Sequence, residues 1–368
     1  MIKVHGTTAY TSFVNGVMEI VDIADPANPV PLSMFAIPRD SRVLDFEMNG
    51  QYGFAAIGDR DVIIDHAGLR VYDMVDPTNP VEVGMIQEGI QFVQFEIRGD
   101  LMYALGGFME WEPTHIYTLD ISDPTAPGIL GSTPLTLQGV SLGDGLTVAD
   151  GKAYVAGFEG GLQIYDLSDP TTPALLSHFT EIPLPFDVKV VGDHAFVTSS
   201  RGGGDGSLFS VDVSDPTSPV IDDVWGGFEG LMSLEIEGST AYAIKMDGNG
   251  LERALVFDVA DPMSIQLIGS SETIYSDIAV SNNTLYGFGP QTTGFDTDIR
   301  IEIVDVSNSC NPSCAADMNN DGDLNFFDVS SFLGAFSAGD LMADFTGDGQ
   351  LNFFDVSAFL AAFGSGCP

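Results

Sequence analysis

Two acidic segments near the C-terminal end of the chain carry oxygen-bearing side chains at a spacing that suits calcium. The first covers residues 317–328, and the second covers residues 344–355, 27 positions later. Each has oxygen ligands at loop positions 1, 3, 5, 9 and 12 and a glycine at position 6, as an EF-hand loop does. Calcium takes six to eight oxygens, and the glycine lets the chain turn sharply around the ion. The sequence therefore predicts two bound calcium ions.

The two loops differ where the chemistry allows it. Position 7 donates only its backbone carbonyl, so Asp323 and Gln350 are equivalent there. Position 12 carries Asp where EF-hands carry Glu, no helix is expected before either loop, and one helix is expected after each, over 326–336 and 353–363. The predicted metal ligands are Asp317, Asn319, Asp321, Asp323, Asn325, Asp328, Asp344, Thr346, Asp348, Gln350, Asn352 and Asp355.

This duplicated loop and helix resembles a dockerin of the type that ends in Gly-Cys, here Gly366-Cys367. The resemblance implies a small α calcium-binding domain with a tethering role, whose partner is cohesin-like or a cell-surface anchor. Its recognition positions fall on Phe326, Phe327, Phe353 and Phe354, which are apolar where the cellulosomal type is often polar. These phenylalanines either pack in the core of the small domain or form an exposed docking surface.

All three cysteines lie in the C-terminal sixth of the chain. We predict a disulfide between Cys314 and Cys367, because they bracket the duplicated module and its near two-fold symmetry brings its ends together. In the chain-entropy model a loop of that length is stabilised by roughly 4 kcal/mol. Cys310 is then left over or competes, and a Cys310–Cys314 bridge would close only a very short ring.

Before this tail, one segment recurs seven times. The first Asp of the pattern stands at positions 46 to 51 residues apart: Asp22, Asp73, Asp120, Asp166, Asp212, Asp258 and Asp305. In six copies a second Asp follows three residues later and precedes Pro, which predicts a tight turn. Alternating and β-branched residues predict four short strands per unit, for example over 187–191, 195–198, 208–212 and 220–224.

A unit of this length cannot bury both faces of its sheet alone, so we predict an all-β fold, a β-propeller of radially packed sheets. Seven units favour seven four-stranded blades, with six or eight as alternatives. The seventh unit lacks an obvious fourth strand, and we expect the N-terminus to supply the strand that closes the ring. The predicted domains are the propeller over 1–308, a linker over 309–313 and the dockerin-like domain over 314–368.

The repeats resemble the LVIVD-repeat family of bacterial and archaeal surface proteins, as in Glu-Ile-Val-Asp at 19–22 and 302–305. The resemblance covers roughly residues 1–308. It implies an extracellular propeller and brings no catalytic residues.

The first strand of each blade is expected to line the central channel. Nine residues before the aromatic residue of each second strand stand Asp45, Gln94, Gly145, Asp187, Ser233 and Asp277. The three aspartates are candidates for binding a cation or a cationic ligand. The alternative, which we favour, is that they cap local turns. The long connections between second and third strands, one of which holds Trp111, are expected on the same face. The candidate ligand site is Asp45, Gln94, Asp187, Ser233, Asp277 and Trp111.

Composition excludes several classes of partner. The 368 residues include 53 acidic and 12 basic side chains, a formal charge of −41, which opposes binding to nucleic acid or to anionic membranes. No apolar run is long enough to insert in a membrane. The first residues lack the features of a signal peptide, so a secreted or cell-surface location assumes a targeting segment outside this sequence.

These features predict an extracellular, non-catalytic binding or display protein. The propeller serves as an interaction scaffold, and the tail provides calcium-dependent anchoring or assembly. The alternative is a propeller hydrolase with a metal at the central channel. The five histidines share neither a position in the units nor metal-ligand spacing. Asp45, Asp187 and Asp277 belong to the second, fifth and seventh units, so no two are adjacent in a seven-fold ring and the geometry for one shared ion is unfavourable. We therefore expect no tightly bound metal in the channel and no hydrolase activity.

Overall fold

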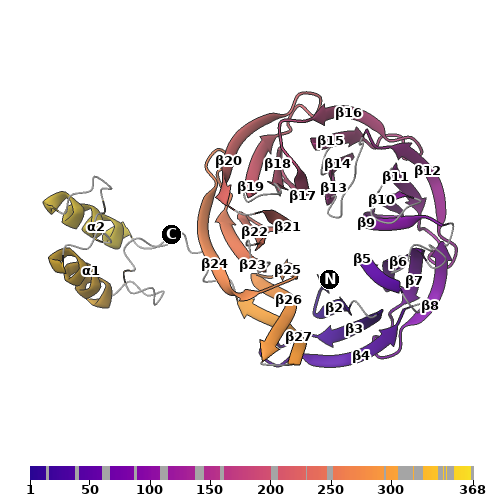
Figure 1. Ribbon diagram of the computed structural model, residues 1–368, viewed down its shortest axis with the longest axis horizontal. Helices are drawn as coiled ribbons and strands as arrows, with labels where there is room; N and C mark the ends of the chain where they lie inside the picture. Colours follow the sequence, from indigo (N-terminus) through magenta and orange to yellow (C-terminus); the bar gives the residue numbers. More distant parts are fainter. Residues whose placement is uncertain are drawn as a thin grey trace. The chain divides into compact units, whose positions relative to one another are not determined.

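Seven antiparallel sheets stand around a central opening in the computed structural model, with the innermost strand of each sheet facing that opening (Figure 1). The chain divides into two units, Met1–Val304 and Asp305–Pro368. The structure describes residues 1–13, 16–37, 41–59, 67–86, 89–107, 115–136, 145–157, 161–199, 206–228, 230–246, 252–293, 296–305, 318, 326–338, 343, 345 and 352–365.

Each of the first four units of the sequence forms one four-stranded blade, in which consecutive strands are neighbours. The first blade comprises β1 (Ile2–His5), β2 (Thr8–Phe13), β3 (Val17–Asp22) and β4 (Val30–Ala36). The second comprises β5 (Ser41–Asn49), β6 (Tyr52–Asp59), β7 (Gly68–Asp73) and β8 (Val81–Ile86). The third comprises β9 (Gln91–Arg98), β10 (Leu101–Gly107), β11 (His115–Asp120) and β12 (Gly128–Pro134). The fourth comprises β13 (Gly145–Ala149), β14 (Lys152–Gly157), β15 (Gly161–Asp166) and β16 (Ala174–Phe179).

The remaining three blades continue the same order around the ring. The fifth comprises β17 (Pro185–Val191), β18 (His194–Ser199), β19 (Gly206–Asp212) and β20 (Val220–Phe228). The sixth comprises β21 (Leu231–Glu237), β22 (Thr240–Met246), β23 (Glu252–Asp258) and β24 (Gln266–Ile274). The described part of the seventh comprises β25 (Asp277–Ser281), β26 (Thr284–Thr293) and β27 (Asp296–Asp305). The predicted seven-bladed propeller is confirmed.

The repeated aspartates shape the turn between the third and fourth strands. Asp73 accepts a hydrogen bond from the backbone N–H of Val75, and Asp76 accepts one from Thr78, both at 3.0 Å. The same pair of contacts recurs in the other blades that carry the Asp-Pro step. In these six sheets the register with the fourth strand shifts at one equivalent point just before the first Asp, as a β-bulge does. The aspartates are therefore architectural.

The apolar cores lie between blades rather than within them. One cluster joins Phe54 and Leu69 of the second blade to Phe92 and Tyr117 of the third. Further clusters span other neighbouring pairs of blades. Each unit therefore depends on its neighbours for burial of its apolar faces, as the sequence predicts.

Among the described residues, the first and seventh blades exchange no strand where the ring closes. β1 pairs with β2 inside the first blade, so the expectation that the N-terminus completes the seventh blade is wrong. The first unit already holds four strands, and its inner strand packs directly against the seventh blade. Ile2 and Val21 of the first blade share a buried cluster with Tyr286 and Phe288 of the seventh. Apolar packing therefore seals the ring.

The second unit contains two helices, α1 (Phe326–Ala338) and α2 (Phe353–Ser365), as the duplicated sequence predicts. Phe332 and Phe359 occupy equivalent positions and stack with ring centroids 4.1 Å apart and an interplanar angle of 3°. Phe345 meets both rings edge-on. In the part of the chain that the structure describes, neither helix is long and apolar enough to cross a membrane.

A glycine on the outer strand makes room for the turn of the next blade, and this generates a test. A Cβ atom at Gly131 would lie 2.0 Å from the carbonyl oxygen of Thr171 in the following blade. At the equivalent Gly269, a Cβ would meet only the side chain of Val256 at 3.7 Å. We expect Gly131→Ala to lower the free energy of unfolding by about 1–3 kcal/mol, because backbone must move. Denaturant unfolding measures this.

Gly269→Ala is the matched control and is expected to leave the free energy of unfolding nearly unchanged. Equal effects of the two substitutions would contradict the described contact between the blades.

Candidate functional site

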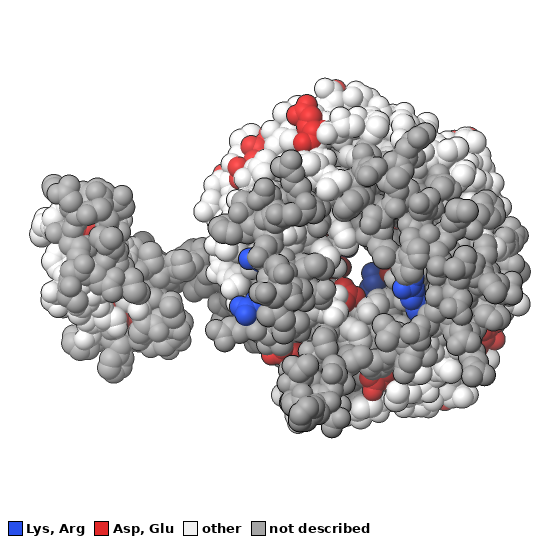
Figure 2. Space-filling view, viewed as in Figure 1, with Lys and Arg blue, Asp and Glu red and all other residues white. Residues whose placement is uncertain are grey.

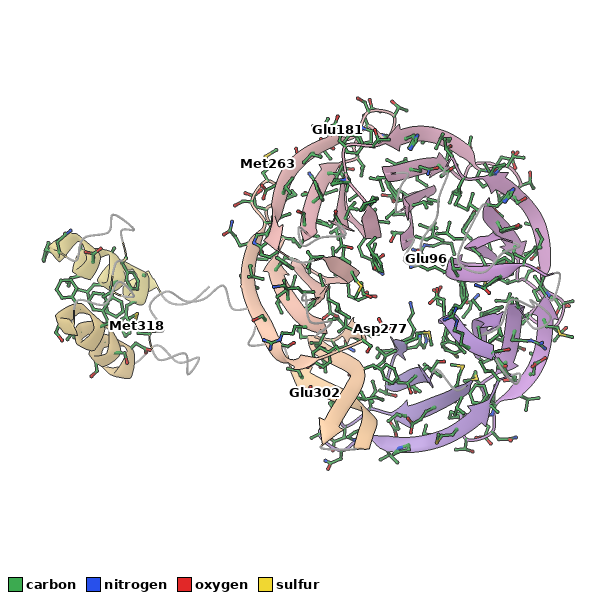
Figure 3. All side chains as sticks on the ribbon, in the orientation of Figure 1. Glu96, Glu181, Met263, Asp277, Glu302 and Met318 are labelled. Carbon is green, nitrogen blue, oxygen red and sulfur yellow. The ribbon has the colours of Figure 1, made fainter. Side chains whose placement is uncertain are left out.

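The first strands of the blades line two cavities of about 410 and 400 Å³ in the central opening. The larger lies at the beginnings of these strands and the other at their ends, and we name them the start-side and end-side chambers. Lys3, Asp45, Gln94, Lys189 and Glu235 line both. Figure 2 shows basic and acidic side chains together around this opening, and Figure 3 places Glu96 and Asp277 beside it.

The channel residues predicted from the sequence come together. The start-side chamber is lined by all six members of the predicted ring: Asp45, Gln94, Gly145, Asp187, Ser233 and Asp277. Trp111, the other member of the candidate ligand site, lies outside the described residues. The period of the repeat therefore locates the channel correctly.

Each of the three aspartates holds backbone N–H groups on both sides of a blade boundary. Asp45 accepts hydrogen bonds from Phe46 of its own strand and from Phe95 of the next blade, both at 2.9 Å. The equivalent bonds run to Asp187 from Val188 at 2.8 Å and Leu234 at 2.9 Å, and to Asp277 from Ile278 at 3.0 Å and Ile2 at 2.8 Å. These donors lie in strands rather than in turns, so the aspartates bridge blades instead of capping turns.

The other ring positions adapt to the same boundary. Gln94 accepts a hydrogen bond from the N–H of Leu146 in the next blade at 3.0 Å. Gly145 leaves space, because a Cβ there would lie 2.5 Å from the Cα and Oδ1 of Asp187. Ser233 lines the chamber. At Gly145, the absence of a side chain thus follows from the closeness of Asp187 in the next blade.

A second ring, two residues further along each first strand, was not singled out from the sequence. Its members are Lys3, Glu47, Glu96, Thr147, Lys189, Glu235 and Ala279. Glu47 accepts a hydrogen bond from the N–H of Ile97, and Glu96 accepts one from that of Val148, both at 2.9 Å across a boundary. The alternation of side chains along a strand puts these residues on the same face as the first ring, and that period was the available signal.

Two lysines pair with carboxylates inside the channel. Lys3 lies 3.0 Å from Asp45, and Lys189 lies 3.4 Å from Glu235. Burial alone would lower the pKa of Lys3, but the carboxylates of Asp45, Glu235 and Asp277 outweigh it and raise that pKa. For Lys189, Glu235 and Asp187 likewise outweigh burial and raise the pKa. Both lysines therefore stay charged at neutral pH.

In three of the buried acids, by contrast, burial outweighs the nearby lysines and disfavours the charged form. Burial raises the pKa of Glu47 to about 7, and burial also raises the pKa values of Glu96 and Asp187.

The three aspartates of the ring, Asp45, Asp187 and Asp277, belong to the second, fifth and seventh blades. Among the residues that the structure describes, no group of three or more His, Cys, Asp or Glu side chains is placed to hold a metal ion.

In the second unit, three of the predicted calcium ligands lie within the described residues. Asp328 and Asp355, at position 12 of their loops, are both 0% exposed. Asp355 accepts a hydrogen bond at 2.7 Å from the N–H of Asn352, which precedes α2. The remaining predicted ligands and the three cysteines lie outside the described residues.

The predicted recognition phenylalanines are described only in part. Phe353 is 76% exposed, while the side chains of Phe326, Phe327 and Phe354 are not described. The core between the helices is instead built from Phe332, Phe345 and Phe359. Phe353 is therefore a surface residue.

The raised pKa of Glu47 predicts how stability depends on pH. A carboxyl group whose pKa is raised by folding stabilises the fold most below its unfolded value near 4.3 and loses that contribution as pH rises through about 7. Glu47→Gln keeps an acceptor for Ile97 and removes the charge. We expect it to gain about 1–2 kcal/mol of unfolding free energy relative to wild type between pH 5 and pH 8, after allowance for solvent screening.

Denaturant unfolding at the two pH values measures the gain. Glu181→Gln, at an exposed position, controls for the loss of one negative charge from this acidic chain (Figure 3). A Glu47→Gln difference that is the same at pH 5 and pH 8 would contradict the assignment.

Comparison with known proteins supports the repeat and the fold. The LVIVD repeat matches residues 1–35, 144–181 and 186–223. These segments correspond to the first, fourth and fifth blades, so one LVIVD repeat corresponds to one four-stranded blade. No curated protein matches the chain.

Among solved structures, a functionally unknown protein from Desulfotomaculum acetoxidans DSM 771 is similar, with a TM-score of 0.60 and 11% identity over 77% of this chain and 89% of that one. Saccharomyces cerevisiae Sqt1 is similar with a TM-score of 0.53 and 10% identity over 77% of this chain and 76% of that one. At such identities the likeness shows the fold alone. The chain is a seven-bladed β-propeller that carries LVIVD repeats, followed by two short helices.

Proposed function

We propose that this chain is an extracellular, non-catalytic binding or display protein, in which the propeller is an interaction scaffold and the tail is a calcium-dependent module for anchoring or assembly. The observation that carries the non-catalytic part is the state of the channel carboxylates. Asp45, Asp187 and Asp277 each accept two backbone N–H groups, one of them from the next blade.

A carboxylate held in this way is a poor general acid, base or metal ligand. It already accepts two backbone N–H groups, and withdrawing it would cost those hydrogen bonds. Asp45 is also paired with Lys3. These contacts favour a structural role over the hydrolase alternative.

The buried carboxylates of the second unit support the proposal of two calcium ions. Asp328 and Asp355 are fully buried beside an apolar core, where an ionised carboxylate needs a cation or several hydrogen bonds. Both stand at position 12 of their loops, which in an EF-hand loop provides a ligand. The residues present therefore fit calcium, which would stabilise the loops by neutralising their charge.

The surface of the helices supports a docking role for the tail. Phe353, Leu333 and Leu360 are exposed, and the two leucines occupy equivalent positions in the duplicated helices. Such apolar exposure in a small domain suits a protein partner, here a cohesin-like module or a cell-surface anchor. The Cys314–Cys367 disulfide stays a prediction of the sequence.

Calcium titration of the full chain tests the tail. After removal of divalent ions, calorimetry is expected to show two calcium ions per chain with dissociation constants on the order of millimolar or tighter. Asp328→Ala and Asp355→Ala are each expected to reduce this to one ion. Chelation is expected to lower the unfolding temperature of the tail and leave that of the propeller unchanged, because the cores are separate.

Asp100→Ala, an exposed acid in a turn of the propeller, is the control and is expected to leave two ions bound. A wild-type chain that binds one calcium ion or none would contradict the proposal.

An assay of the full chain against ester, phosphoester and glycoside substrates tests the non-catalytic role of the channel. We expect no turnover. Asp187→Ala is expected to lower the free energy of unfolding by about 1–3 kcal/mol, because it leaves the N–H groups of Val188 and Leu234 without an acceptor. Asp187→Asn keeps one acceptor and is expected to lose less. Turnover that a folded Asp187→Asn protein lacks would overturn the proposal.

A further inference from the structure

Met85, on the outermost strand of the second blade, is an exposed methionine whose sulfur contacts a buried cation. Met85 is 51% exposed, whereas Arg70, which stands opposite it in the register of β7 and β8, is 9% exposed. Nη1 of Arg70 donates to the Sδ atom of Met85 at 3.1 Å and to Oε1 of Glu82 at 2.8 Å. Because a thioether sulfur is a weak acceptor, this contact uses the donor of the guanidinium poorly.

The guanidinium is held in place independently of the methionine. Leu69 and Val71 on β7 are buried in the core shared with the third blade, so the alternation of the strand directs Arg70 to the opposite face of the sheet. There Arg70 forms an ion pair with Glu82 of β8. The cation therefore stays beside the sulfur when the chemistry of Met85 changes.

Oxidation by a peroxide would change the chemistry of this sulfur. A sulfur lone pair forms an S–O bond, the O–O bond breaks, and hydrogen peroxide leaves as water. The sulfur loses the two electrons that the peroxide gains. The product, methionine sulfoxide, is polar and presents an oxygen where the thioether presented only sulfur. A hydrogen bond from a guanidinium to such an oxygen is charge-assisted and stronger than the bond to the thioether.

We propose that Met85 is an oxidation site: a peroxide converts it to methionine sulfoxide, and Arg70 stabilises that product by donating a hydrogen bond to the new oxygen. A guanidinium carries five N–H donors, so it serves the carboxylate of Glu82 and the sulfoxide together. Oxidation then strengthens the contact between β7 and β8. Methionine sulfoxide is reduced again by methionine sulfoxide reductases, so the change is reversible. This inference is independent of the proposed roles of the channel and the tail.

The first blade contains a matched methionine in a different electrostatic setting. Met34 is the fifth residue of β4, as Met85 is of β8, and it is 64% exposed. Its partner in the register with β3 is Glu19. An ionised carboxylate offers no donor to a sulfoxide oxygen and repels it. The repeat thus places one methionine opposite a cation and the other opposite an acid.

Denaturant unfolding of the full chain before and after treatment with hydrogen peroxide tests the proposal. Peptide mapping by mass spectrometry verifies one added oxygen on Met34 and on Met85. Wild type, Met85→Leu and Met34→Leu are each measured reduced and oxidised, so that the difference between wild type and one variant isolates one methionine. We expect oxidation of Met85 to raise the ratio of folded to unfolded propeller about threefold or more, because a hydrogen bond to a charged group is gained. Oxidation of Met34 is expected to leave that ratio unchanged or to lower it.

Two further variants test whether the cation causes the gain. Arg70→Leu removes every donor, and Leu255 occupies the equivalent position in the sixth blade, so leucine suits this site. It is expected to abolish the gain from oxidation of Met85. Glu82→Gln removes the carboxylate, keeps Arg70 and is expected to preserve the gain.

Three results would overturn the proposal. The first is an equal effect of oxidation at Met34 and Met85, or a lower folded ratio after oxidation of Met85. The second is a gain that persists in Arg70→Leu. The third is a gain that Glu82→Gln removes as completely as Arg70→Leu does, since the effect would then follow the ion pair and not the donor.

Discussion

The propeller depends on finding hydrogen-bond acceptors for the N–H groups at the inner edge of each blade. The first strand of a blade has the second strand on one side and the channel on the other. The N–H groups on its channel side therefore have no partner within the sheet. The preceding blade supplies the acceptors from its own first strand: Asp45 and Glu47 serve the third blade, and Gln94 and Glu96 serve the fourth. Asp277 does the same for β1 where the ring closes. Side chains of these channel-facing positions thus connect the first strands of neighbouring blades by hydrogen bonds.

This constraint explains why a channel rich in carboxylates need not be a catalytic one. Accepting an N–H requires an oxygen, and Asp, Glu and Gln reach the next strand from alternate positions of β5 and β9. Lys3 and Lys189 offset part of the charge that accumulates, and at Glu47 burial outweighs the attraction of Lys3 and raises the pKa to about 7. Acidity in the channel is therefore a consequence of joining the blades.

The sequence was sufficient for features contained in one repeat and insufficient for those shared between two. The Asp-Pro step, the four strands and the lining of the channel follow from spacing alone, and all are present. The partner of Asp187 is Leu234, 47 residues away in another unit, and no pattern within a repeat identifies it. The N-terminal strand was misassigned for the same reason. Its place depends on whether apolar packing of Ile2 against Phe288 can close the ring, which only the assembled blades reveal.

The repeat fixes the positions that connect first strands, and the residues shortly before the ring differ from blade to blade. Three residues before the ring, the second and third blades carry Arg42 and Gln91, while the fifth carries Leu184 at the equivalent place. The hydrogen bonds described between first strands come from the ring and from the positions two residues after it. A buried polar group at such a position that has no hydrogen-bond partner lowers stability and makes no compensating contact. Gln91 is such a group, since neither polar atom of its buried carboxamide, which packs over Gly58 of the second blade, has a partner among the described residues.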